Sequence, residues 1–373
     1  MSGLYIHVPF CKQACHYCDF HFSTSSQGHL EMVHAMSREI TLQKKFLSAP
    51  LDSVYFGGGT PSLLDQASLD ILLDAVYASF SVEPTAEITL EANPDDLSKE
   101  KLVALRKSGI NRLSIGIQSF DDVILRYLNR AHDSKTAYAC LPNAREVGFN
   151  NISMDLIYAI PGLSPNLWKE TLKVAIQFKP EHISSYGLTV EDKTVFGNWM
   201  KNGKLLAVDD ENAASQFEVL MDVLTGSGYD HYEISNFCVP GLYSRHNSSY
   251  WKQMPYLGIG PSAHSYNGTS RFFNVRNNGK YVKSIGDGEV PFESELLTRE
   301  NKINEYLLTG LRTRWGCNLE YLQKELGDDM MTRSGPYLQR LLDQGLMLLD
   351  QKTIRLTQKG RLLADKITAD LMT

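Results

Sequence analysis

Three cysteines in one short segment constrain this chain more than any other feature of its sequence. Cys11, Cys15 and Cys18 lie in the stretch CKQACHYC, which directly follows a strand-like segment. Thiolates bind soft iron and zinc centres, and this close spacing lets sulfurs of one loop converge on one centre. A zinc site would need a fourth ligand, for which His16 and His21 are the nearest candidates. The segment therefore predicts a soft-metal site, either an iron–sulfur centre or a closed zinc site.

The other cysteines and the charge limit the class of protein. Cys140, Cys238 and Cys317 are widely scattered, so the cysteines do not form the pattern of a disulfide framework. The N-terminal sequence has no signal-peptide pattern, and we find no apolar stretch of the roughly 18 residues that a transmembrane helix needs. We therefore expect a cytoplasmic protein without a transmembrane segment. The net charge of −6 argues against a nucleic-acid partner, because such proteins usually carry a basic face.

Hydrophobic periodicity predicts six strands that alternate with helices up to about residue 190. Such an alternation implies right-handed crossovers and a parallel sheet, either open and doubly wound or closed as a barrel. In both arrangements, functional residues should gather at the carboxyl ends of the strands. The strands are expected at 3–8, 52–56, 87–90, 112–117, 152–160 and 182–188, and the helices at 29–47, 69–77, 99–107, 121–128, 136–147 and 166–178, with Pro142 interrupting the fifth helix.

The second half of the chain has two different patterns. After one helix pattern at 212–224, an aromatic run rich in Gly, Asn and Ser predicts a connecting region that packs on the main domain. Toward the C-terminus, helix patterns surround a predicted hairpin at 346–356, and together they predict a small winged-helix-like helical domain. Because the chain is acidic, we interpret this domain as a structural cap and not as a DNA-reading domain. The predicted domains are 1–190, 191–297 and 298–373.

The Cys-x3-Cys-x2-Cys loop after a first strand, together with Gly-Gly-Thr-Pro after a second strand, closely resembles the radical S-adenosylmethionine (SAM) superfamily. The resemblance implies a partial (β/α)6 barrel of the TIM type. It also implies a [4Fe-4S] cluster in which Cys11, Cys15 and Cys18 each ligate one iron. The fourth iron is then open to the amino and carboxylate groups of SAM. One electron from an external donor, passed through the cluster, can then break a carbon–sulfur bond of SAM.

The resemblance narrows to the oxygen-independent coproporphyrinogen III oxidase-like family and covers nearly the whole chain. By this similarity, an aromatic residue lies over the adenine of SAM, a glycine turn meets its amino group, and polar residues after successive strands complete the site. The implied SAM-binding residues are Tyr5, Tyr17, Gly58, Gly59, Thr60, Glu91, Gln118, Arg130 and Asp155. Taken singly, some have structural alternatives: Glu91 could cap a turn, Gln118 could satisfy buried backbone groups, and Arg130 could pair with Asp133.

Two departures from the oxidases point to the haem chaperone (HemW) branch of this family. The oxidases carry a further cysteine two residues after the third ligand, where this chain has Phe20, and they have a longer segment ahead of the first strand. Residues 246–251, HNSSYW, resemble a motif of the chaperone branch that is associated with haem binding. Imidazole ligates haem iron and flat rings pack against a porphyrin. The haem-binding candidates are His246, Asn247, Tyr250 and Trp251.

The resemblance thus implies a chaperone that binds haem as cargo and hands it to acceptor haemoproteins, expected in the respiratory chain. The alternative is an enzyme that converts coproporphyrinogen III to protoporphyrinogen IX by radical SAM chemistry, so the question of enzyme activity stays open. Peripheral membrane association is left open too. His246 could instead hold an irregular loop, with Tyr250 and Trp251 in the core. Cys238 is a second soft ligand candidate, although an isolated cysteine is more commonly a small core residue.

Overall fold

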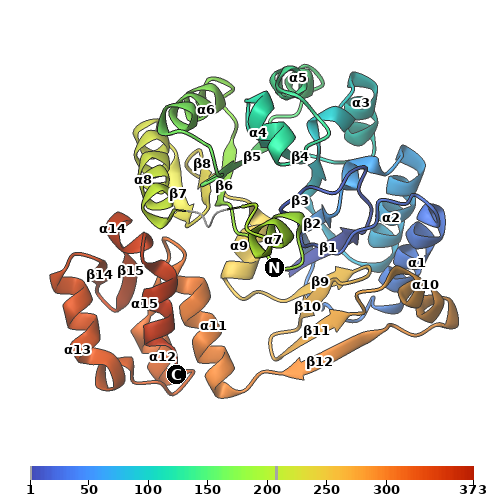
Figure 1. The fold of residues 1–373 in the computed structure, drawn as a ribbon. Helices are drawn as coiled ribbons and strands as arrows, with labels where there is room; N and C mark the ends of the chain where they lie inside the picture. Colours follow the sequence, from blue (N-terminus) through green and yellow to red (C-terminus); the bar gives the residue numbers. More distant parts are fainter. Residues whose placement is uncertain (1, 206–208) are drawn as a thin grey trace.

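Six parallel strands form the centre of the molecule, which is described here by a computed structural model of residues 2–205 and 209–373. They pair in chain order and curve into a partial barrel (Figure 1). The sequence prediction of a partial (β/α)6 barrel is therefore confirmed. The strands are β1 (Ser2–Val8), β2 (Leu51–Gly58), β3 (Val82–Ala92), β4 (Arg112–Gln118), β5 (Ile152–Tyr158) and β6 (His182–Gly187).

Six helices cover the outer face of these strands (Figure 1). They are α1 (His29–Leu42), α2 (Gln66–Ser79), α3 (Lys99–Lys107), α4 (Asp122–Tyr127), α5 (Ser134–Glu146) and α6 (Pro165–Gln177). All but α1 begin with an Asp or Ser side chain that accepts a hydrogen bond from a first-turn N–H group. The expectation that Pro142 interrupts α5 is wrong: the helix continues through it, because its buried face, which includes Cys140 and Ala144, packs on the sheet.

Alternation along the strands divides apolar from polar side chains. On β1, Leu4, Ile6 and Val8 are buried in the main hydrophobic core with the helices. Since successive side chains of a strand point to opposite faces, Tyr5 and His7 point to the inside of the barrel. The interior is therefore polar and aromatic, and the helix-facing side is apolar. This division leaves the polar and aromatic side chains of neighbouring strands facing the space inside the barrel.

Short strands extend the barrel sheet at both edges, which the sequence did not predict. At one edge, β9 (Tyr256–Ile259) pairs in parallel with β1, and an antiparallel series follows through β10 (His264–Tyr266), β11 (Ser270–Asn274) and β12 (Phe292–Leu296). At the other edge, β8 (Asn236–Cys238) and β7 (Asp230–Glu233) follow β6. The helices of this region are α7 (Val195–Lys201), α8 (Asp210–Gly226), α9 (Arg245–Trp251) and α10 (Asn278–Asp287).

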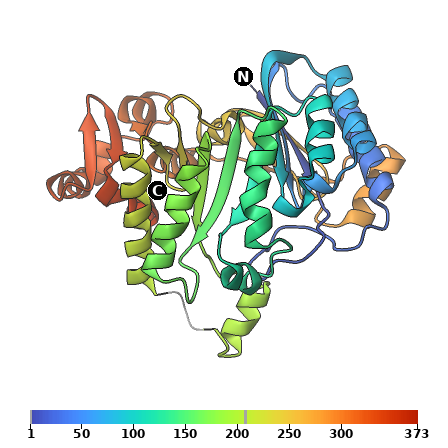
Figure 2. The ribbon, with the colours of Figure 1, turned by 90° about the horizontal axis from the view of Figure 1, so that it is seen from above.

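The C-terminal region forms a helical unit with a small antiparallel sheet of order β13-β15-β14. It stands to one side of the barrel in both views, drawn in red (Figure 2), and has its own hydrophobic cluster. Within the described part of the chain, no helix combines the length and apolarity that crossing a membrane requires. The elements are α11 (Arg299–Leu311), β13 (Cys317–Asn318), α12 (Leu319–Lys324), α13 (Met330–Asp343), β14 (Met347–Asp350), β15 (Thr353–Leu356), α14 (Gln358–Arg361) and α15 (Ala364–Leu371).

Candidate functional site

The loop between β1 and α1 carries the three cysteines at the carboxyl end of β1. A backbone bridge between Phe10 and Ser23 closes the base of this loop, and the Cys11 N–H donates to the Ser23 carbonyl at 2.9 Å. Cys11, Cys15 and Cys18 are partly exposed and line one cavity. Burial raises the pKa of Cys11 and Cys18 to about 11, so metal ligation has to remove their protons.

The two histidines that would complete a zinc site have other partners. His16 Nδ1 lies 2.9 Å from the Tyr127 carbonyl oxygen, and its ring packs against Trp199. His21 Nε2 lies 2.7 Å from Asn278 Oδ1, at the start of α10. Both imidazoles therefore hold the flanks of the cysteine loop in place.

A cavity of about 490 Å³ lies between the cysteine loop and the carboxyl ends of the strands, and we call it the cluster cavity. Its volume lies within the range of roughly 300–1,000 Å³ that is typical of small-molecule pockets. Besides the cysteines, it is lined by Tyr17, Gly58, Gly59, Thr60, Glu91, Gln118, Arg130 and Asp155. The structure thus brings together all the predicted SAM-binding residues except Tyr5.

The glycine turn after β2 packs closely on the start of the cysteine loop. Gly58 has φ +105°, and a Cβ there would lie 2.5 Å from His7 Nδ1. A Cβ on Gly59 would lie 2.6 Å from the Phe10 carbonyl oxygen. Because only glycine fits both positions, the backbone of this turn can approach a small molecule bound beside the cysteine loop without side chains in the way.

Two buried carboxyl groups face the same cavity. Glu91, near the end of β3, accepts hydrogen bonds from the Tyr55 hydroxyl at 2.8 Å and the Gly58 N–H at 3.2 Å. Burial raises the pKa of Glu91 to about 7, so a ligand ammonium group would favour its ionised form. Asp155 lies in the middle of β5 and not at the carboxyl end of this strand. The Ser114 hydroxyl donates a hydrogen bond to its carboxylate at 3.2 Å. Burial raises the pKa of Asp155 too.

Arg130 connects the cysteine loop to the strand ends. Its Nη1 lies 3.3 Å from both Cys15 Sγ and the Tyr17 hydroxyl, and its Nη2 donates to the Gly116 carbonyl at 2.9 Å. Arg130 Nε is buried and has no hydrogen-bond partner among the described residues. In the described part of the chain, the structure does not contain the ion pair between Arg130 and Asp133 that the sequence allowed. The Asp133 side chain instead caps the N-terminus of α5. A cationic group beside a cysteine fits an anionic iron–sulfur cluster with a small-molecule ligand.

Gln118 has an unusual backbone conformation at the end of β4. Its φ of 62° is in the left-handed region, which is uncommon for a residue other than glycine. Such strain is concentrated at functional sites, where the surrounding structure maintains it. Here it turns the Gln118 side chain into the cluster cavity.

The predicted haem-binding residues lie on α9, between two cavities. His246 is 1% exposed; its Nδ1 lies 2.9 Å from the Ser53 hydroxyl and its Nε2 lies 2.8 Å from the Tyr250 hydroxyl. Burial lowers the pKa of His246 to about 3. Asn247 lines the cluster cavity, whereas Tyr250 and Trp251 line a second one. The structure therefore brings Tyr250 and Trp251 to a common space and leaves His246 inside the barrel wall.

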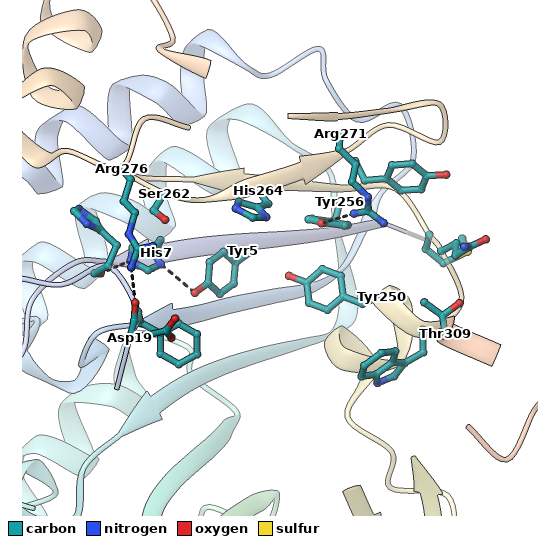
Figure 3. Close-up of a pocket in the computed structure, with 16 residues that line it drawn as sticks. Tyr5, His7, Asp19, Tyr250, Tyr256, Ser262, His264, Arg271, Arg276 and Thr309 are labelled. Atoms are coloured by element: carbon teal, nitrogen blue, oxygen red, sulfur yellow. Dashed lines mark hydrogen bonds between the residues drawn. The ribbon is translucent and has the colours of Figure 1, made fainter. Parts of the chain in front are cut away.

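The second cavity, of about 510 Å³, is bounded by β1, β10, β11 and α9, and we call it the aromatic cavity (Figure 3). Tyr5 belongs to this cavity and not to the cluster cavity. Asp19 and Phe20, which follow the third cysteine, line both cavities, and Phe20 is 66% exposed. The sequence did not predict most residues that line the aromatic cavity. They include His7, His21, Met254, Tyr256, His264, Tyr266, Arg271 and Arg276. The available signal was the presence of His264 and Tyr266 on β10 and of Arg271 beside two phenylalanines on β11.

Comparisons with known proteins agree with this geometry. Residues 5–175 match the Radical SAM superfamily, and residues 297–363 match the HemN C-terminal domain. The Heme chaperone HemW of Bacillus subtilis is 36% identical, over 98% of this chain and 98% of that protein. The Heme chaperone HemW of Lactococcus lactis is 34% identical, over 98% and 96%. The structure of coproporphyrinogen III oxidase (HemN) from Escherichia coli is 25% identical with a TM-score of 0.85, covering 100% of this chain and 90% of that chain.

Proposed function

Because the chain belongs to the radical SAM superfamily and, within it, to the family of the HemW haem chaperones, we propose that it binds haem and transfers it to acceptor haemoproteins. Full-length similarity to proteins named as haem chaperones supports this function. The family carries a [4Fe-4S] cluster and SAM, and the cluster cavity has residues that fit both groups. The haem is the cargo, and the cluster belongs to the resident machinery.

The residues of the cluster cavity have separate tasks in this proposal. Cys11, Cys15 and Cys18 would hold the cluster, which supplies single electrons to a ligand of its open iron when it is bound. The backbone of Gly58 and the carboxylate of Glu91 would receive the ammonium group of SAM. The remaining lining residues, Tyr17, Gly59, Thr60, Gln118, Arg130 and Asp155, would complete the SAM site.

The observation that carries the proposal is the aromatic cavity beside the cluster cavity. It offers flat rings for a planar ligand, imidazoles for an iron, and arginines for carboxylates. Asp19 and Phe20 form a wall that both cavities share. A ligand in the aromatic cavity would therefore lie directly beside the cysteine loop.

The likeness to the Escherichia coli coproporphyrinogen III oxidase favours one alternative, formation of protoporphyrinogen IX by radical chemistry. An anaerobic assay separates the two functions: the protein with its cluster reconstituted is incubated with SAM, a reductant and coproporphyrinogen III. We expect no protoporphyrinogen in this assay, because Phe20 stands where the oxidases have a cysteine. Protoporphyrinogen formation coupled to SAM cleavage would contradict the chaperone function.

The proposal extends to the setting of the protein. We propose the cytoplasm as its location, respiratory haemoproteins as acceptors, and a separate protein as electron donor for the cluster. We also propose three functional units: the barrel at 1–190, the connecting region at 191–297 with the HNSSYW segment, and the domain at 298–373 as a structural cap.

A further inference from the structure

Three imidazoles line the aromatic cavity, and they differ in how many of their ring nitrogens already have hydrogen-bond partners. Both ring nitrogens of His7 have partners, since Nδ1 lies 3.2 Å from the Tyr5 hydroxyl and Nε2 lies 2.8 Å from the His21 carbonyl oxygen. His21 has one partner of this kind, since its Nε2 lies 2.7 Å from Asn278 Oδ1, and this bond ties its ring to α10 beside the cysteine loop. The ring of His264 has no hydrogen-bond partner among residues 2–205 and 209–373, and its only close aromatic neighbour there is Phe273, with ring centroids 4.8 Å apart.

The position of His264 suits a ligand that spans the cavity. It projects from β10 at the middle of the cavity, between Arg276 on one side and Tyr256 and Arg271 on the other (Figure 3). Its side chain is open to the cavity, and partial desolvation by the cavity walls, followed by the positive charge of Arg271, lowers the pKa of His264. The imidazole is therefore neutral at neutral pH, the form that ligates a metal.

The two arginines of the cavity differ in whether a carboxylate of the protein already neutralises them. Arg271 is paired with Glu305, with Nε and Nη2 donating to the carboxylate at 2.7 and 2.9 Å. Arg276 donates to the backbone carbonyl of Asp19 and forms no ion pair within the described residues. Its guanidinium is exposed and keeps its charge and further donors for a ligand carboxylate.

Building on the proposed function, we propose that haem binds in the aromatic cavity with His264 as an iron ligand and Arg276 as the partner of its propionates. Tyr250 and Trp251 then contact the porphyrin from α9, and His246 positions Tyr250 through its 2.8 Å hydrogen bond. This arrangement assigns the iron to a residue outside the HNSSYW segment. It also places the haem against Asp19 and Phe20 of the cysteine loop.

The test is a titration of the purified full-length protein with ferric haem, followed by Soret absorbance and electron paramagnetic resonance. We expect His264→Ala to weaken haem binding on the order of tenfold or more and to shift the Soret band, and we expect added imidazole to restore the band in His264→Gly. His34→Ala, which removes an exposed histidine of α1, is the matched control and should bind as the wild type does. His246→Gln tests whether His246 is the iron ligand in place of His264.

A second comparison isolates the propionate contact. Arg276→Ala should weaken the binding of haem but not that of haem dimethyl ester, which lacks the carboxylates. An unchanged Soret band in His264→Ala, or equal losses for haem and its ester in Arg276→Ala, would overturn the corresponding assignment while haem binding by the wild type upholds the function. If the wild type itself gives no Soret shift, the proposed function fails and the site fails with it.

Discussion

His246 Nδ1 and the hydroxyl of Ser53 lie 2.9 Å apart inside the barrel, although 193 positions separate the two residues in the chain. The opposite ring nitrogen lies 2.8 Å from the Tyr250 hydroxyl. In this arrangement His246 offers no free nitrogen to a haem iron. It instead fixes α9 against β2, so that Tyr250 and Trp251 face the aromatic cavity.

The first prediction concerns the stability of this connection. His246→Ala leaves a cavity and removes two buried hydrogen bonds, so we expect the free energy of unfolding to fall by about 2–4 kcal/mol. Urea denaturation followed by circular dichroism measures it. The exposed His34→Ala should change the free energy by less than about 0.5 kcal/mol. A His246→Ala protein of wild-type stability that no longer binds haem would instead indicate a ligand.

The second prediction concerns acid sensitivity. Burial lowers the pKa of His246 to about 3, whereas an unfolded histidine has a pKa of about 6.5. Below pH 6.5 the unfolded state takes up the proton and the folded state does not, so the stability from this group is complete above that pH and declines as the pH falls. His246→Gln removes the titration. Between pH 7.5 and 5.5, we expect the wild type to lose about 1.4 kcal/mol more than His246→Gln; equal losses would show that His246 is protonated in the fold.

The third prediction concerns Glu91 in the cluster cavity. Glu91→Gln keeps the side-chain shape but removes the charge, so it should weaken SAM binding on the order of tenfold. Anaerobic calorimetry on the protein with its cluster reconstituted measures the affinity. Glu83→Gln, at the exposed start of β3, is the matched control. Equal SAM affinity in both variants would reduce Glu91 to the turn-capping role.

The fourth prediction concerns the metal. Cys15→Ser should abolish the iron content and the broad visible absorbance of a [4Fe-4S] cluster after reconstitution, because the three cysteines of the loop are its only thiolates in the cluster cavity, as far as the structure describes the chain. Cys140→Ala, which changes a buried cysteine on α5, should keep both signals. Retention of iron in Cys15→Ser, or a stoichiometric zinc ion in its place, would refute the assignment.

The barrel could be predicted because its strands and helices have strong hydrophobic periodicity. The edge strands lack this signal: β12 is exposed along its whole length, and β8 and β10 contain only three residues each. Short strands at a sheet edge are stabilised by pairing with their neighbours, which a local pattern does not contain. The aromatic cavity was missed for the same reason, since β10 and β11 form one of its walls.

The residues of the cluster cavity were easier to predict than their depth in the barrel. Glycines and acidic or amide residues after successive strands pointed to the same edge of the sheet, and Glu91 and Gln118 are near that edge. Asp155 and Tyr5 lie deeper, because alternation directs any inward residue of a strand to the interior, whatever its distance from the strand end. The burial of His246 depends on Ser53 and Tyr250, and such a tertiary contact has no signature in the motif itself.

Titration of the purified wild-type protein with ferric haem is the most direct measurement of the chaperone function. We predict a saturable shift of the Soret band to a position that reports an axial nitrogen ligand, and release of that haem when an acceptor apoprotein is added. A broad band that remains that of free haem at every concentration would contradict it, and so would protoporphyrinogen formation coupled to SAM cleavage in the anaerobic assay.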